Sequence, residues 1–197
     1  AIPAAVWVLV QGAGLNDNLI TSVCRYGLVP AELTGGKPLG FSIQMSEAWS
    51  CSIDNDAINW LTPLTTIFLH GSWMHIIGNM WFFWVFGNNI EDSMGPARFI
   101  VFYLLCGAIA AGAHVLSSPG SPVPTVGASG AVSGIMGAYI VLFPRARVNL
   151  LFILVWFIRV IPVPAWGAIL WWFAIQVISA LPALSTDASG GVAYAAH

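Results

Sequence analysis

The stretch of the chain from Phe99 to Pro144 contains no Asp, Glu, Lys or Arg. Two further stretches, from Ser72 to Asn89 and from Val160 to Thr186, share this property. A charge at the centre of a bilayer costs about 2.5–3.5 kcal/mol on insertion scales, so long apolar stretches without charge are typical of membrane-spanning segments. Lipid is therefore the strongest constraint on what this chain can fold into.

The overall composition excludes an ordinary soluble domain. Of the 197 residues, 58% are apolar and 7% are Asp, Glu, Lys or Arg, whereas about 25% are charged in a typical soluble domain. The six Lys and Arg residues are scattered and form no basic patch, which argues against a nucleic-acid partner. The expected surroundings are a lipid bilayer.

Helix-breaking residues divide the charge-free stretches into candidate spans. One bilayer crossing takes about 20 residues, and the Ser, Pro and Gly residues at 117–124 cannot continue a helix, so the longest stretch holds two spans. The predicted spans are Ser72–Asn88, Pro96–Leu116, Gly127–Phe143 and Pro164–Leu181.

Both ends of the chain predict partial spans. Ala1–Gly12 is apolar but reaches only about 18 Å as a helix, short of a bilayer core of about 30 Å. Ser189–His197 is shorter still. We interpret both as pieces of truncated first and last helices. The sequence thus predicts an all-α polytopic membrane protein with six spans, in a single domain over residues 1–197.

The apolar run Val148–Ile161 is not counted among these spans. As a helix it would reach about 21 Å, Pro162 would end it, and Arg147 and Arg159 lie at its two ends. An interfacial or re-entrant segment fits this pattern better.

The arginines also predict the orientation. Arg98, Arg145, Arg147 and Arg159 fall on one side of the membrane, which the positive-inside rule makes cytoplasmic. The segment Ala13–Gly71 then lies outside. Loops of this length are usually functional or fold on themselves, and its apolar residues favour a structured cap in the membrane interface.

Cys24 and Cys51 both lie in this external segment. Oxidising surroundings could join them, but sequence spacing alone does not fix the geometry of a disulfide, and two free thiols are the favoured interpretation. Cys106 lies in the middle of a predicted span and is expected to be a small packing residue.

Four uncharged polar residues lie where lipid is expected, which makes each a candidate for function: His75, Asn79, Ser129 and His197. His75 and Asn79 are four residues apart and share a helix face. Ser129 begins a short span whose start is expected to be submerged below the outer surface. Nine helical residues place His197 about 13 Å along its own helix, at a comparable depth. We expect the four side chains to meet in the outer half of the membrane.

This set of groups fits nucleophilic catalysis. A serine hydroxyl becomes a nucleophile when a base lies within hydrogen-bond reach, and His197 could be that base for Ser129. His75, Asn79 and the backbone N–H of Ser129 could donate hydrogen bonds to an oxyanion. No Asp or Glu falls within a predicted span, so a Ser–His dyad is expected rather than a triad.

Metal-dependent and aspartyl protease chemistry is not expected. The chain has no His-Glu-x-x-His motif and no Asp inside a predicted span. We therefore expect no metal and no cofactor.

The candidate residues lie in three motifs: His70-Gly-Ser-Trp-Met-His75-Ile-Ile-Gly-Asn79, then Gly127-Ala128-Ser129-Gly130, and finally Gly191-Val-Ala-Tyr-Ala-Ala-His197. In their order and spacing these motifs resemble the rhomboid family of intramembrane serine proteases. Four residues after Ser129 this chain has Ser133, where the family sometimes has an aromatic residue that stacks on the catalytic histidine.

The resemblance implies a six-helix rhomboid-like bundle with a large, membrane-associated first external loop. It implies that Ser129 is the nucleophile, that His197 is the general base and acid, and that His75 and Asn79 line the oxyanion hole. It further implies cleavage of transmembrane segments of other membrane proteins through an acyl-enzyme, and a substrate gate formed by the fifth span and the loop after it.

Two other classes of function are weighed against this protease. A catalytically inactive rhomboid-like protein that binds transmembrane helices would be expected to lack Ser129 or His197, and both are present. A small transporter would be expected to carry a charged or broken-helix site at the midplane, and none is visible in the sequence. The expected localisation is multi-pass in a prokaryotic cytoplasmic membrane, with the active site open to the outside, and the oligomeric state is left open.

Overall fold

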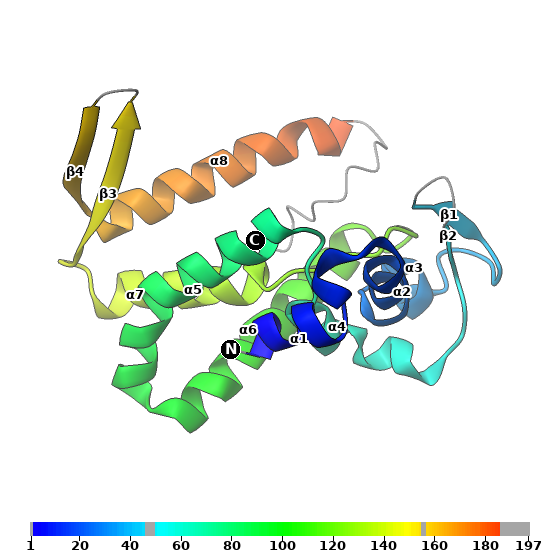
Figure 1. The fold of residues 1–197 in the computed structure, drawn as a ribbon. Coiled ribbons are helices and arrows are strands. Elements are labelled where there is room, and N and C mark those ends of the chain that lie inside the picture. Colours follow the sequence, from blue (N-terminus) through cyan, green and yellow to red (C-terminus); the bar gives the residue numbers. More distant parts are fainter. Residues whose placement is uncertain (1, 46–49, 155–156, 186–197) are drawn as a thin grey trace.

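The computed structural model describes residues 2–45, 50–154 and 157–185 (Figure 1). Most of this part of the chain is helical. The long helices are α5 (Trp73–Met94), α6 (Pro96–Ser117), α7 (Ser129–Leu142) and α8 (Ala165–Ser185). The short helices, including the 3-10 turns η1 to η3, are α1 (Ile2–Leu9), η1 (Gly12–Gly14), α2 (Asn16–Tyr26), α3 (Pro30–Thr34), η2 (Ala57–Leu61), α4 (Thr62–Thr65) and η3 (Thr66–Phe68). The strands are β1 (Ser42–Gln44), β2 (Ser50–Ser52), β3 (Arg147–Leu154) and β4 (Phe157–Pro164).

Each of the four predicted internal spans is a helix, and local signals explain where two of them begin. The Ser72 side chain caps α5 by accepting a hydrogen bond from the His75 N–H at 3.1 Å. Gly95, at φ +81°, turns the chain between α5 and α6, and Pro96 occupies the first turn of α6.

The count of six spans is not confirmed. Within the described residues, α6 alone is both long and apolar enough to cross a membrane, and α7 and the segment Ala165–Ile178 are shorter apolar helices. The predicted last span, Ser189–His197, lies outside the described residues.

The fold is mostly helical, as the sequence analysis predicted, but the described residues are not strictly all-α, because two antiparallel hairpins are present. Strands β3 and β4 pair from Arg147 with Pro164 to Leu154 with Phe157, in the segment predicted to be interfacial or re-entrant. This segment is rich in Val, Ile, Leu and Phe, which suit a strand, and its prolines suit an edge strand but not a helix. The hairpin projects at one end of the molecule (Figure 1).

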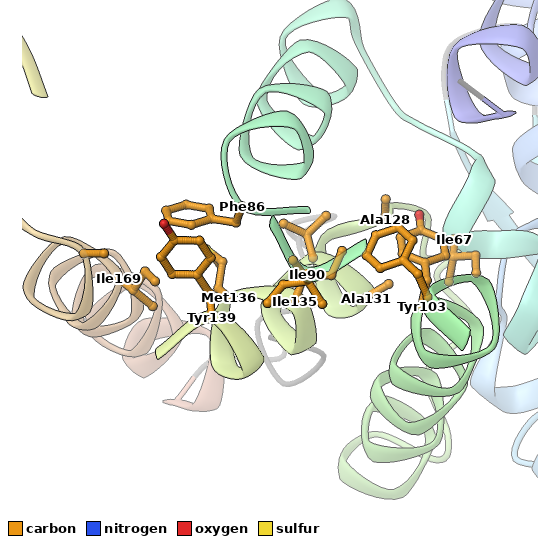
Figure 2. Close-up of a cluster of buried hydrophobic side chains, with 13 residues drawn as sticks. Ile67, Phe86, Ile90, Tyr103, Ala128, Ala131, Ile135, Met136, Tyr139 and Ile169 are labelled. Carbon is orange, nitrogen blue, oxygen red and sulfur yellow. The ribbon is translucent and has the colours of Figure 1, made fainter. Parts of the chain in front are cut away.

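The main core lies between α5, α6 and α7 (Figure 2). Phe86 of α5 meets Tyr139 of α7 edge-on at a centroid distance of 5.0 Å. Helices α6 and α7 approach closely because Gly134 faces Cys106: a Cβ at Gly134 would lie 2.4 Å from the Cys106 sulfur. This contact confirms the prediction that Cys106 is a small packing residue.

The segment that was predicted to be external folds on itself as expected, and we call residues 13–71 the cap. Cys24 of α2 and Cys51 of β2 form a disulfide with a Cα–Cα distance of 5.3 Å, so the favoured interpretation as free thiols is wrong. The folding of the β1–β2 hairpin toward the end of α2 brings the two residues together, and spacing in the sequence could not show this. Immediately after α2, Leu28 pairs with Thr125, which connects the cap to the segment before α7.

Candidate active site

A cavity of about 440 Å³ lies where the start of α5, the start of α7 and the middle of α6 meet. His75, Asn79 and Ser129 all line it, so the structure brings together three of the four residues that the sequence analysis singled out. The fourth, His197, lies outside the described residues. The cavity is therefore the candidate active site.

Ser129 is the first residue of α7, two residues after the predicted start of this span at Gly127. A helix N-terminus presents backbone N–H groups and the positive end of the helix dipole, which favour developing negative charge. The Ser129 carbonyl accepts a hydrogen bond from the Ser133 hydroxyl at 2.8 Å. Ser133 is thus bonded to the first turn of the helix.

Gly127, two residues before Ser129, is required by its geometry. Its φ is +141°, a backbone conformation that disfavours side chains. A Cβ there would lie 2.8 Å from His75 Nε2 and 3.6 Å from Ser129 Oγ. The histidine nitrogen and the serine hydroxyl therefore border the same small volume, which only glycine leaves open.

His75 lies in the first turn of α5, with its two ring nitrogens in different surroundings. Its Nδ1 accepts a long hydrogen bond of 3.4 Å from the Gly71 N–H. A neutral imidazole that accepts at Nδ1 carries its proton on Nε2. Because Nε2 is the atom beside Gly127, this tautomer directs an N–H donor toward the volume next to Ser129.

Asn79 lies one helical turn beyond His75 and is buried. Its side-chain amide donates to the His75 carbonyl at 2.9 Å. An asparagine amide has two N–H donors, so this single bond fixes the side chain and leaves a second donor for a ligand in the cavity.

His70 is a neighbour of this site that the sequence analysis missed. His70 lies in the loop before α5, which begins at Trp73, so helix periodicity does not describe how its ring lies relative to that of His75. The His70 ring is fully buried and meets the His75 ring edge-on at a centroid distance of 5.1 Å. Burial, together with the nearby His75, lowers the pKa of His70 to about 3, so this ring is neutral near pH 7.

The segment leading into Ser129 is held by several hydrogen bonds. Thr125 Oγ1 and His114 Nε2 of α6 lie 3.0 Å apart, within hydrogen-bond distance. Thr66 Oγ1 donates to the Thr125 carbonyl, and the Gly127 N–H donates to the Thr66 carbonyl at 3.0 Å. These contacts fix the backbone immediately before the candidate nucleophile. Within the described residues, no group of three or more His, Cys, Asp or Glu side chains could hold a metal ion.

Comparisons with known proteins give one family. A family model described as the Rhomboid domain matches residues 58–197. Rhomboid protease GluP of Bacillus subtilis is 37% identical over 79 residues, which cover 40% of this chain and 15% of that protein. Rhomboid protein 1, a mitochondrial protein of Saccharomyces cerevisiae, is 36% identical over 115 residues, which cover 56% of this chain and 31% of the yeast protein.

A human relative is more distant. The mitochondrial presenilin-associated rhomboid-like protein is 29% identical over 92 residues, which cover 46% of this chain and 24% of that protein. These alignments thus span less than a third of the length of each of these relatives. No solved structure matches the chain.

Proposed function

Because the chain belongs to the rhomboid family of integral membrane proteins, we propose that it is an intramembrane serine endopeptidase that cleaves transmembrane segments of other membrane proteins. The observation that carries this proposal is the meeting of Ser129, His75 and Asn79 in one cavity at a helix N-terminus. One relative, GluP of Bacillus subtilis, is named a rhomboid protease, which supports the same class of reaction.

The proposed reaction begins with attack of Ser129 Oγ on the carbonyl carbon of the scissile peptide bond, while His197 removes the hydroxyl proton. The tetrahedral oxyanion accepts hydrogen bonds from His75 Nε2–H, from the Asn79 amide and from the N-terminus of α7. Collapse of this intermediate breaks the C–N bond, and His197 returns the proton to the leaving amine. Water, activated by His197, then hydrolyses the acyl-enzyme.

The proposed site opens toward the side of the membrane on which the cap lies. Water has to reach the acyl-enzyme, and the disulfide of the cap is consistent with an oxidising, non-cytosolic compartment on that side. The prokaryotic cytoplasmic membrane of the sequence analysis stays a proposal, because the relatives named above are bacterial and mitochondrial.

The test is cleavage of a single-span substrate protein by the purified chain in proteoliposomes. Ser129→Ala and His197→Ala are expected to abolish cleavage, and Asn79→Ala to slow it about tenfold to a thousandfold by removing one oxyanion donor. Ser93→Ala is the matched serine control, because Ser93 lies near the other end of α5 and its hydroxyl donates to the Asn89 carbonyl of the same helix. Turnover by Ser129→Ala at the wild-type rate would refute the proposed mechanism.

The alternative, an inactive rhomboid-like protein that binds transmembrane helices, is separated by covalent labelling. A fluorophosphonate forms a bond only with an activated serine. Labelling that is lost in Ser129→Ala supports the peptidase, whereas an unlabelled wild-type protein that still retains the substrate helix supports the binding protein.

A further inference from the structure

Gln11 holds the backbone of the loop that leads into α5 and His75. The Gln11 side chain is fully buried. Its Oε1 accepts a hydrogen bond from the His70 N–H at 2.9 Å, and its Nε2 donates to the His70 carbonyl at 2.7 Å. Gln11 lies 59 residues before His70 and outside residues 58–197, the part that matches the family model.

The second of these hydrogen bonds also orients the donor to His75. The His70 carbonyl and the Gly71 N–H belong to the same planar trans peptide group, so they point in opposite directions from one rigid unit. When Gln11 Nε2 holds the carbonyl on one side, the N–H is directed to the other side. That N–H is the group that donates to His75 Nδ1.

The orientation of the Gly71 N–H also determines which ring nitrogen of His75 carries the proton. Acceptance at Nδ1 keeps the proton of His75 on Nε2, and Nε2 lies beside Gly127 and Ser129. The buried ring of His70, the residue that Gln11 holds, also packs against the His75 ring. Donors and acceptors in such a chain also polarise one another, which strengthens each bond.

We propose that Gln11 is a positioning residue for the peptidase reaction: its amide fixes the peptide group 70–71, and this group sets the tautomer and the orientation of His75 as an oxyanion donor. The inference rests on the proposed function. It links the first helix of the chain to the oxyanion hole without any contact between Gln11 and the substrate.

A purely structural role has to be separated from this one, because a buried amide that satisfies two backbone groups also stabilises the fold. The two roles differ in what they predict for each folded molecule. Loss of stability lowers the number of active sites, whereas loss of oxyanion positioning lowers the rate at each remaining site.

The experiment uses the full chain in proteoliposomes and a fluorophosphonate probe. The end point of labelling at Ser129 counts the folded sites, and the rate of labelling and kcat are then expressed per site. Gln11→Met keeps the length of the side chain and removes both hydrogen bonds. We expect kcat per site and the labelling rate to fall at least about tenfold, with KM within about twofold of the wild-type value.

Gln11→Glu provides a second test, which can still be carried out if Gln11→Met does not fold. A protonated glutamic acid can still donate to the His70 carbonyl, whereas an ionised one can only accept. The hydrogen bonds of Gln11 and Gly71 connect Gln11 to the loop after η3 and to the first turn of α5. The titratable side chains on that loop and that turn are His70 and His75. The rate per site of Gln11→Glu, divided by the wild-type rate at the same pH, is therefore expected to fall as the pH rises.

Thr62→Val is the matched control. Thr62 is also buried and donates to a backbone carbonyl, that of Asn59 at 2.7 Å, but it does not line the cavity. We expect fewer labelled sites and an unchanged rate per site. A wild-type rate per site in Gln11→Met, or a pH-independent ratio in Gln11→Glu, would overturn the positioning role while leaving the peptidase intact. A wild-type protein that neither cleaves nor reacts with the probe would overturn the proposed function itself.

Discussion

The two flanks of the α5–α6–α7 bundle are attached to it in different ways. The cap is cross-linked internally by the disulfide, and its backbone bonds directly to the segment before α7, with Ala31 N–H donating to the Ser121 carbonyl at 3.0 Å. Helix α8 covers the other flank (Figure 1) and is buried near its start, at Ala165 and Ile169. From the next turn onward its described apolar side chains are largely exposed. They include Leu170, Trp171, Phe173, Ile175, Val177 and Ile178.

This difference indicates that the two flanks have different roles at the cavity. The cap and Gln11, which lies just before it, hold the groups that have to stay fixed, because the contacts of Thr66 and Gln11 both end at the backbone of the proposed site. On the α8 side, Trp172 and Phe82 both line the cavity, and their ring centroids lie 5.7 Å apart. We therefore expect the substrate helix of the proposed peptidase to enter past α8 rather than past the cap.

The largest expected effect is the loss of thermal stability when the disulfide is removed. Cys51→Ser breaks a cross-link between residues 27 positions apart, and removal of such a cross-link costs about 2–4 kcal/mol. We expect a clear fall in the midpoint of thermal unfolding in detergent. Cys106→Ser is the matched control, because Cys106 is free and lies in α6. An unchanged midpoint in Cys51→Ser would contradict the view that the cap is the firmly fastened flank.

The second expected effect is a loss of stability in acid that depends on His70. The folded protein takes up a proton on His70 only near pH 3, whereas the unfolded chain takes it up near pH 6.5, because burial lowers the pKa of this residue. Its contribution is present above pH 6.5 and is lost as the pH falls toward 3, which amounts to about 2 kcal/mol by pH 5. His70→Phe keeps a buried ring that cannot titrate. Its unfolding free energy should depend less on pH between 6.5 and 5 than that of the wild type, and parallel pH profiles would contradict this.

The sequence alone predicts much of this site because its function requires polar residues in segments where polar side chains are otherwise rare and costly. His75, Asn79 and Ser129 stand out for that reason, and the structure brings them to one cavity. The helix boundaries near Ser72 and Pro96 also follow from local capping and turn residues.

What the sequence does not predict depends on contacts between distant segments. The Cys24–Cys51 disulfide requires the β1–β2 hairpin to fold back on α2, and the Gln11 clamp joins residues 59 positions apart. The β3–β4 hairpin was missed for a different reason: an apolar run with flanking arginines suits an interfacial helix and a hairpin equally well, and periodicity does not separate them.

The third effect concerns the α8 flank and is expected in the rate rather than in the stability. Trp172→Ala removes the ring that meets Phe82 and should make the cavity easier to enter. We expect cleavage of a membrane-embedded substrate to rise about threefold if access limits the rate. Trp171→Ala is the matched control, because that ring is exposed on the same helix. A fall in rate for Trp172→Ala would show that this contact is needed to hold the site and not only to close it.

The smallest expected effect returns to the cap and concerns Glu32 in α3. Partial burial, together with the charge of Asp54, raises the pKa of Glu32 to about 7, although the Asp54 N–H bond at 3.4 Å opposes the shift. The folded state thus holds this proton up to about pH 7 and the unfolded chain only to about pH 4.5, so stability is lost as the pH rises between them. Glu32→Gln cannot ionise and should be more stable than the wild type at pH 8 by under about 1 kcal/mol, since solvent screens this half-buried group, and equal to it at pH 4. Asp17→Asn, at an exposed position at the start of α2, should give no such gain. If Glu32→Gln is no more stable than the wild type at pH 8, ionisation of Glu32 does not destabilise the folded cap, and the expected effect of its partial burial is contradicted.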